Sequence, residues 1–131
     1  MPAMADHTKV NLRSVENAAE KFGMPPELEA RFARSALGLQ KSGVSLFKAG
    51  PGFQVPWGHR HRDQEEVYLV VSGSAIVQFE DEAVELGEWD AVRIPADVAR
   101  SFQAGPEGAE LLAFGAGEQG DAEMIQDFQP G

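Results

Sequence analysis

Short segments of β type, separated at regular intervals by turn-forming residues, dominate the chain from residue 43 onward. Val, Ile, Leu and aromatic residues are concentrated in these segments, and glycines, prolines and acidic residues lie between them. We predict strands over residues 44–49, 53–61, 67–71, 75–79, 83–86, 91–94, 100–104 and 110–114. Residues 72–74 predict a tight hairpin and residues 80–82 an acidic turn. Strands this short and evenly spaced are typical of a small antiparallel barrel or a double-sheet jelly roll, so an all-β fold is predicted.

Helical periodicity occurs only before this region. Apolar residues at three- and four-residue spacings in residues 11–22 predict a short helix or turn that stops at Gly23. Residues 25–37 predict a second helix that begins at two prolines and is ended by Gly38. At 131 residues the chain is long enough for one core and too short for two. We therefore expect a single domain: a helical arm (1–40), a barrel (43–115) and an acidic tail (116–131).

The residues with the most distinctive chemistry lie between positions 59 and 73. His59 and His61 stand two apart on a predicted strand, and alternation along a strand places both imidazoles on one face. A polar turn at residues 62–65 then brings a carboxylate, either Glu65 or Glu66, back opposite the histidine pair. Two neutral imidazoles and one carboxylate can form the three-ligand site of non-haem iron and related divalent metals.

The spacing in this stretch resembles the first motif of the cupins. That motif reads His-x-His, four residues, Glu, six residues, Gly, and is carried here by His59, His61, Glu66 and Gly73. Glu66, rather than Glu65, keeps the distance to the glycine. The motif normally opens with a glycine six positions before the first histidine, whereas Gly52 lies seven positions before it. The resemblance implies a cupin-like double-stranded β-helix or jelly-roll barrel, with His59, His61 and Glu66 as ligands of iron, manganese, nickel or zinc.

The second cupin motif is eroded. Its positions fall here on Trp89, Pro95, Asp97, Arg100 and Ala104. Only the proline matches, and Arg100 stands where the family places its last metal-binding histidine. A guanidinium has no lone pair for a metal, and at ~5 Å it would repel a divalent ion by roughly 6–7 kcal/mol at an effective dielectric of ~20. Two outcomes stay open: Arg100 turns away from a weak three-ligand metal site, or it turns inward and pairs with Glu66 in a metal-free pocket.

Face alternation also predicts a ligand pocket. Trp57 shares the face of the histidines, Tyr68 shares that of Glu66, and Phe102 shares that of Arg100. An apolar, aromatic pocket with a few convergent polar groups is typical of a small-molecule site. The competing interpretation is that the three aromatic residues belong to the core and that the histidines are hydrogen-bonded residues of a barrel without a metal.

Composition limits the classes of partner that the protein is expected to bind. Eleven basic residues against twenty-one acidic ones give a net charge of −10, which argues against nucleic acid or an anionic membrane as the main partner. The chain has no cysteine, which excludes disulfides and thiolate ligands and fits a reducing compartment. It also has no secretory pattern at its start and no apolar run long enough to cross a membrane. We expect a cytoplasmic protein with a small-molecule ligand.

Residues 67–71 are apolar at every position, so this strand is expected to be covered on both faces, by the barrel interior and by the arm or a second subunit. The cupin resemblance, in which dimers through the outer sheet are frequent, implies a homodimer. Three functional classes follow: a metal-dependent enzyme, a metal-free pocket in which Arg100 binds an anionic group, and a binding or regulatory module without turnover.

Overall fold

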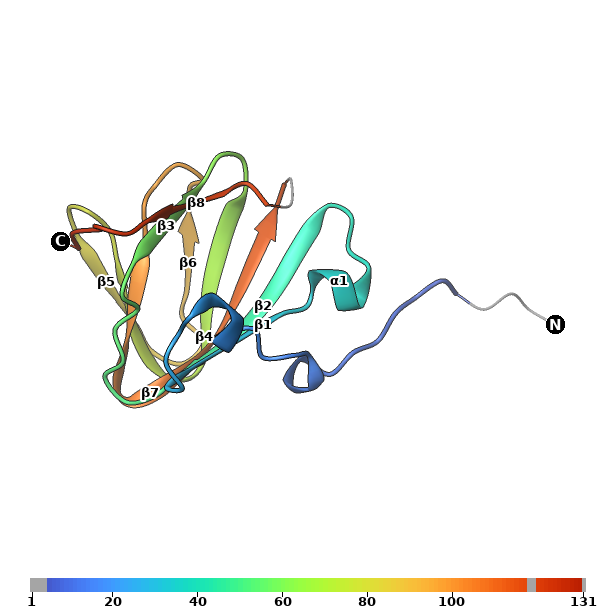
Figure 1. The fold of residues 1–131 in the computed structure, drawn as a ribbon, viewed down its shortest axis with the longest axis horizontal. Coiled ribbons are helices and arrows are strands. Elements are labelled where there is room, and N and C mark those ends of the chain that lie inside the picture. Colours follow the sequence, from blue (N-terminus) through green and yellow to red (C-terminus); the bar gives the residue numbers. More distant parts are fainter. Residues whose placement is uncertain (1–4, 118–119, 131) are drawn as a thin grey trace.

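Two β-sheets of unequal size enclose the core of the protein (Figure 1). The computed structural model describes residues 5–117 and 120–130. Its elements, in chain order, are η1 (Leu12–Ser14), η2 (Glu20–Phe22), β1 (Leu28–Phe32), α1 (Arg34–Leu37), β2 (Ser42–Ala49), β3 (Gly58–His61), β4 (Glu65–Gln78), β5 (Ala83–Leu86), β6 (Ala91–Ile94), β7 (Ser101–Ala116) and β8 (Ala122–Ile125). Among these residues no helix has the length and apolarity needed to span a membrane.

The larger sheet is built around β4 and β7, which pair antiparallel along most of their length. The strand order is β1-β2-β7-β4-β5, and β6 also pairs with β4. The edge of β4 that faces away from β7 pairs with two strands: residues 66–69 pair with β6, and residues 75–78 pair with β5. The smaller sheet consists of β3 and β8. The two predicted ligand strands, β3 and β4, therefore belong to different sheets.

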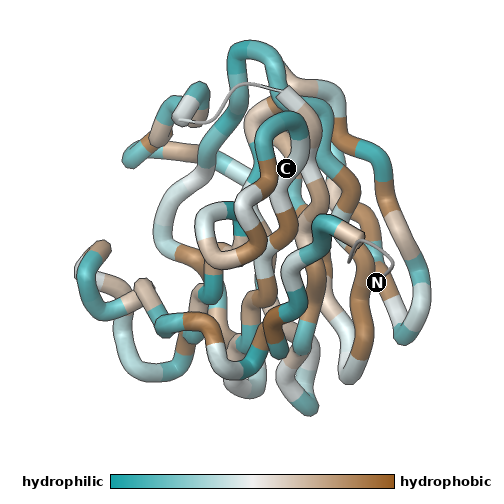
Figure 2. Tube along the Cα trace, turned by 90° about the vertical axis from the view of Figure 1, so that its right-hand side faces the viewer, coloured by the Kyte–Doolittle hydropathy of each residue, from teal (hydrophilic) through white to brown (hydrophobic). Residues whose placement is uncertain are grey.

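The hydrophobic core lies between the sheets, as alternation along the strands predicts. Its fully buried members include Leu28, Val70, Val77, Ile94 and Leu111. Hydrophobic segments follow the strands, whereas many of the connecting loops are hydrophilic (Figure 2). The same alternation places Glu66 on the inner face of β4, two residues before Tyr68. The predicted all-β barrel is confirmed.

The arm contains far less helix than the sequence predicts. Residues 11–22 form only two single 3-10 turns, and the helix expected over residues 25–37 is wrong. Leu28, Ala30 and Phe32 instead lie on strand β1, which adds to the edge of β2, and only the four residues of α1 are helical. The apolar residues of this segment fit a two-residue repeat as well as a helical one, and the unpaired edge of β2 selects the strand.

The hairpin predicted at residues 72–74 is also wrong, because β4 continues through it. The register against β7 shifts on either side of Gly73, whose φ is +75°. A β-carbon at Gly73 would lie 2.1 Å from the carbonyl oxygen of Gly108, so the glycine allows two strands to approach closely at a bulge. In the same way, the two strands predicted over residues 100–114 are one strand, β7.

Candidate metal centre

The two histidines lie on β3, where the backbone is fixed on both sides. One edge of β3 pairs with β8, and the backbone of His59 exchanges two hydrogen bonds of 2.9 Å with that of Arg100. The imidazole rings of His59 and His61 lie edge to face with their centroids 5.2 Å apart. His61 is buried and His59 is half-buried. Both side chains therefore project from one strand face, as their spacing predicts.

Glu66 reaches the histidine pair from the facing sheet. Its carboxylate oxygen Oε1 lies 3.2 Å from Nε2 of His61 and 3.6 Å from Nε2 of His59. Residues 62–64 form the bend that connects β3 to β4, so the predicted turn places the carboxylate opposite the imidazoles. Glu65, the competing carboxylate, is exposed and lies 3.8 Å from Arg93 on the outside of the barrel. The alternation of β4 thus selects Glu66.

These three side chains fit a divalent metal. One ligand atom from each residue can be chosen so that all three lie within 4.8 Å of one another. Nε2 of His61 and Oε1 of Glu66 are buried and have no hydrogen-bond partner in the described structure. Buried polar atoms without partners are rare, and an unfilled ligand site is one physical reason for them. Imidazole and carboxylate are also ligand types that iron, manganese, nickel and zinc accept.

Arg100 turns inward. Its side chain is fully buried, Nη2 donates a 2.7 Å hydrogen bond to the carbonyl of Pro95, and Nη1 lies 3.4 Å from Oε1 of Glu66. Nη1 and Nε have no hydrogen-bond partner among the described residues. A cation thus lies next to the candidate ligands, which agrees with the inward turn and the pairing with Glu66 in the second predicted outcome. A metal held by the three candidate ligands would therefore compete with this guanidinium for Glu66.

The charges in the site are strongly coupled. Burial opposes ionisation of Glu66, but its contacts with His59 and His61 outweigh burial and lower the pKa of the carboxyl to about 2. Burial alone would lower the pKa of His61, yet contacts with Glu66 and Asp121 raise it. Without metal, the ionised carboxylate therefore favours a proton on the imidazole. A metal that binds here must displace that proton.

Asp121 is a site residue that the sequence did not single out. Its carboxylate is buried, and Oδ1 lies 2.8 Å from Nδ1 of His61. The contact forms because residues 120–130 fold back along β3, as β8 does in Figure 1. An acidic residue in an acidic tail carries no spacing signal, so only the tertiary structure reveals it.

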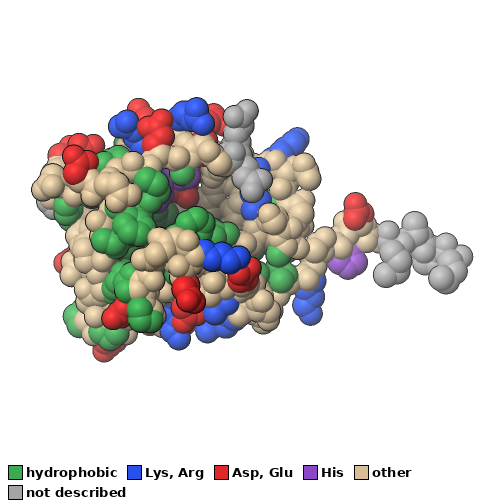
Figure 3. Space-filling view, viewed as in Figure 1, with side chains coloured by type: hydrophobic (Ala, Val, Ile, Leu, Met, Phe, Trp, Pro, Cys, Tyr) green, Lys and Arg blue, Asp and Glu red, His purple; other side chains and the backbone are tan. Residues whose placement is uncertain are grey.

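The residues of the predicted ligand pocket are brought together in part. The rings of Tyr68 and Phe102 lie edge to face with centroids 6.5 Å apart, and both are buried in the core. Burial raises the pKa of Tyr68, which keeps the phenol neutral. Trp57 is half-buried, and its carbonyl accepts a 2.9 Å hydrogen bond from Ser101. Figure 3 shows a hollow on one face of the molecule in which histidine and acidic side chains are visible between hydrophobic ones.

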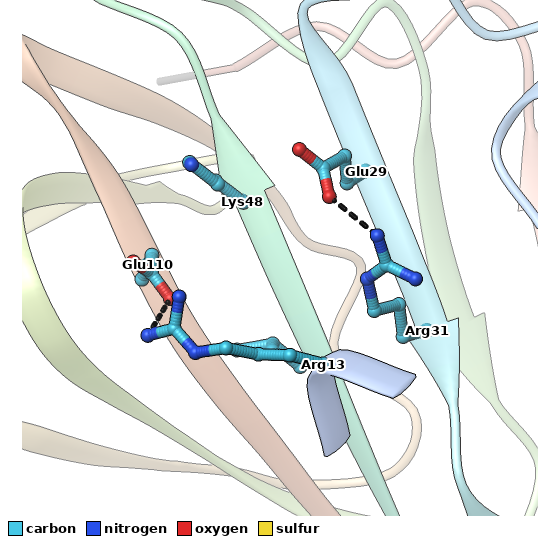
Figure 4. Close-up of a pocket in the computed structure, with 6 residues that line it drawn as sticks. Arg13, Glu29, Arg31, Lys48 and Glu110 are labelled. Carbon is cyan, nitrogen blue, oxygen red and sulfur yellow. Dashed lines mark hydrogen bonds and ion pairs between the residues drawn. The ribbon is translucent and has the colours of Figure 1, made fainter. Parts of the chain in front are cut away.

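A second depression lies on the outer face of the larger sheet (Figure 4). Arg13 pairs with Glu110 at 2.9 Å, and Arg31 pairs with Glu29 at 2.8 Å. Lys48 lines the same depression, as Figure 4 shows, so its cations are largely balanced by neighbouring carboxylates. Such paired surface charges are ordinary features of an exposed sheet face and contribute little to stability.

The fold and the ligand set define this protein as a β-barrel with an interior His-His-Glu site. Residues 45–115 match the family model described as "Cupin domain", which covers more than half of the chain. The chain therefore belongs to the cupin family. A search of curated proteins found no significant match.

Solved structures have the same fold at low sequence identity. A cupin protein from Bacteroides fragilis has a TM-score of 0.70 and 22% identity, covering 89% of each chain. An oxalate decarboxylase from Bacillus subtilis has a TM-score of 0.79 and 21% identity, over 96% of this chain but only 34% of its own. A cupin-superfamily sugar phosphate isomerase from Silicibacter pomeroyi has a TM-score of 0.66 and 21% identity, over 84% of this chain and 76% of its own. The chain thus spans about a third of the decarboxylase.

Proposed function

We propose that this cupin binds one divalent transition metal through His59, His61 and Glu66 and presents it to a small organic molecule. The observation that carries the proposal is the convergence of one ligand atom from each residue within 4.8 Å, together with Nε2 of His61 and Oε1 of Glu66, which are buried and have no hydrogen-bond partner among the described residues. When bound, such a metal lowers the pKa of a coordinated water or supports dioxygen chemistry. The protein supplies a half-buried site in which Glu66 is held ionised and the histidines are fixed by β3.

The test is metal content. Protein purified without chelator is analysed for iron, manganese, nickel and zinc, and titrated with each metal by calorimetry. We expect one metal per chain, lost in His59→Ala and kept in His7→Ala, because His7 is exposed in the amino-terminal segment. Absence of stoichiometric metal from every preparation, with no binding in the titrations, would overturn the proposal. Turnover is then tested on small organic acids and sugar phosphates, the substrate types for which two structurally similar proteins are named.

A second candidate function is favoured by the contact between Arg100 and Glu66. Arg100 is buried, and two of its nitrogens have no hydrogen-bond partner within residues 5–117 and 120–130, so it can bind an anionic group. Glu66 or a histidine can then donate or accept a proton without metal. Because Arg100 is fully buried and already lies beside Glu66, an anion that binds it would compete with Glu66 for the guanidinium. This function requires small carboxylates to bind metal-free wild-type protein and not Arg100→Ala. If the variant and wild type bind alike, Arg100 is not the anion site.

We also propose a cytoplasmic homodimer that uses the outer face of the larger sheet. Val67 lies opposite Phe114 and Leu69 lies opposite Leu112 on this face, and Phe114 is 40% exposed. Apolar neighbours on an exposed sheet face favour burial against another molecule. Light scattering should show a dimer that dissociates in Phe114→Asp and persists in Trp89→Asp, since Trp89 lies in the turn between β5 and β6 and not on one of the paired strands. A monomeric wild type would overturn this part of the proposal.

A further inference from the structure

The carboxylate of Asp121 is fully committed to the segment that carries the histidines. Oδ1 lies 2.8 Å from Nδ1 of His61, and Oδ2 accepts backbone hydrogen bonds from Asp63 at 2.7 Å and Gln64 at 2.8 Å. Its own carbonyl accepts a hydrogen bond from Arg62. One side chain therefore links the imidazole to the bend between β3 and β4. Only a group with two acceptor oxygens can satisfy both sets of donors.

This arrangement decides which nitrogen of His61 faces the ligand set. Nδ1 has good hydrogen-bond geometry to Asp121, whereas Nε2 lies 3.2 Å from Glu66 without forming a hydrogen bond. When the ring is neutral, its single proton is therefore favoured on Nδ1, where it donates to the carboxylate. The lone pair of Nε2 is then directed at the site. Carboxylate partners of this kind orient the histidines that bind metals in proteins.

Residues 120–130, which we call the carboxy-terminal strap, pack against β3 and thereby keep Asp121 beside His61. Directly after Asp121, β8 pairs with β3 in a continuous ladder that runs from Ala122 opposite His61 to Ile125 opposite Gly58. A β-carbon at Gly58 would lie 2.6 Å from Cγ of Phe128, so the strap packs where only glycine leaves room. The strap lies beyond the residues 45–115 that match the cupin family.

We propose that Asp121 is a positioning residue of the metal centre, which holds the Nδ1 proton of His61 so that Nε2 is free to bind the metal. The proposal rests on the metal site proposed above. It assigns to the carboxy-terminal strap a role in completing a site whose ligands all come from the barrel. The affinity for metal should then depend on a residue that touches no metal.

The first test needs no variant and no metal. The chain has only three histidines, so the imidazole nitrogens of histidine-labelled, metal-free protein can be assigned individually by NMR. Above the titration of His61, Nδ1 should carry the proton and Nε2 should be unprotonated. A His61 ring protonated on Nε2 in the wild type would overturn the proposal, whatever the metal affinity.

The second test replaces the carboxylate by an amide of the same shape. In Asp121→Asn only one side-chain oxygen remains as an acceptor. This oxygen should stay with the two backbone N–H groups of Asp63 and Gln64, so the amide NH₂ faces Nδ1 of His61. The proton of His61 should move toward Nε2, and Zn²⁺ or Mn²⁺ affinity should fall by about 10–100-fold. Circular dichroism and the NMR spectrum confirm that the variant folds, and the wild-type tautomer remains a test if it does not.

The matched control is Glu123→Gln, which makes the same charge change two residues along the strap. Glu123 pairs with Arg60 at 3.0 Å on the surface. The metal affinity of Glu123→Gln and the tautomer of His61 in this variant should both equal those of the wild type. Equal losses in the two variants would reduce the role of Asp121 to charge or strap stability and overturn the proposal. A wild type that binds no metal but has the expected tautomer, altered only in Asp121→Asn, would refute the metal site and leave the positioning of His61 standing.

Discussion

Nη1 of Arg100 lies 3.4 Å from Oε1 of Glu66, while the backbone of Arg100 pairs with that of His59. The arginine is thus fixed to the strand of one ligand by its main chain and to another ligand by its side chain. Its guanidinium is fully buried and, among the described residues, donates one hydrogen bond, to the carbonyl of Pro95. The position next to the three candidate ligands therefore carries a permanent positive charge, which we expect to affect both metal affinity and stability.

Arg100→His should strengthen metal binding. The change removes the competing cation and supplies an imidazole at the position of the missing fourth ligand. We expect a gain in Zn²⁺ affinity of at least tenfold, about 1.4 kcal/mol, measured by competition with a chromophoric chelator. Arg93→His, on the exposed side of β6, should leave the affinity unchanged. If Arg100→His binds metal no better than the wild type, the placement of Arg100 beside the ligands is wrong.

Glu66→Leu should destabilise the metal-free protein by about 3 kcal/mol, because it leaves a buried guanidinium without its carboxylate. Arg100→Met should cost less, about 1 kcal/mol, since Glu66 is partly exposed and keeps its contact with His61. Urea unfolding in the presence of chelator measures both. The double variant should be more stable than the sum of the single changes predicts, because neither charge is left unpaired. Strict additivity would show that the pair is not coupled.

Acid should destabilise the metal-free protein through Glu66 and Asp121. Burial raises the pKa of both carboxyls. Contacts with His59 and His61 outweigh this for Glu66, and contacts with His61 and two backbone N–H groups outweigh it for Asp121, so both pKa values are about 2 against ordinary values of 4.5 and 3.8. A lowered pKa stabilises the fold above the ordinary value, and this contribution is lost as the pH falls toward 2. Urea midpoints measured with chelator should therefore drop between about pH 4.5 and 2, and Asp121→Asn should drop less steeply. Parallel profiles for the two proteins would contradict this.

His61 should have the opposite dependence. Its contacts with two carboxylates raise the pKa, so the protonated ring stabilises the metal-free fold at low pH. That contribution is lost as the pH rises through the folded-state pKa. This loss of stability with rising pH should be absent in His61→Gln and present in His7→Gln. The same urea series, extended to pH 9, measures the effect.

Gly73→Ala should cost far more than Gly38→Ala. Both glycines have positive φ, at +75° and +69°, so both substitutions introduce backbone strain of about 1 kcal/mol. Only Gly73 also lacks space, since its β-carbon would approach the carbonyl oxygen of Gly108 to 2.1 Å. We expect an additional loss of at least about 2 kcal/mol, seen as a lower urea midpoint. Equal losses would mean that β4 and β7 can separate at the bulge.

Local sequence was sufficient to predict the candidate ligands on β3 and β4. The two-residue spacing of His59 and His61 and the bend before Glu66 are short-range features, and the distance to Gly73 in the cupin motif favoured Glu66 over Glu65. Strands β5 and β6 were likewise predicted at their observed bounds, 83–86 and 91–94. Features that depend only on residues close together in the chain can therefore be predicted from the sequence.

The sequence by itself thus determined an all-β barrel, and its resemblance to the first cupin motif gave the three candidate ligands, because strand alternation and motif spacing both act over a few residues. The tertiary structure decided the strand at Leu28–Phe32, the inward turn of Arg100 and the contact of Asp121 with His61. Each of these depends on a partner far away in the chain: the open edge of β2, the carboxylate on β4, and a tail that returns 60 residues later to pair with β3. No local pattern encodes such a partner, since the free energy that selects it arises only when the sheets assemble.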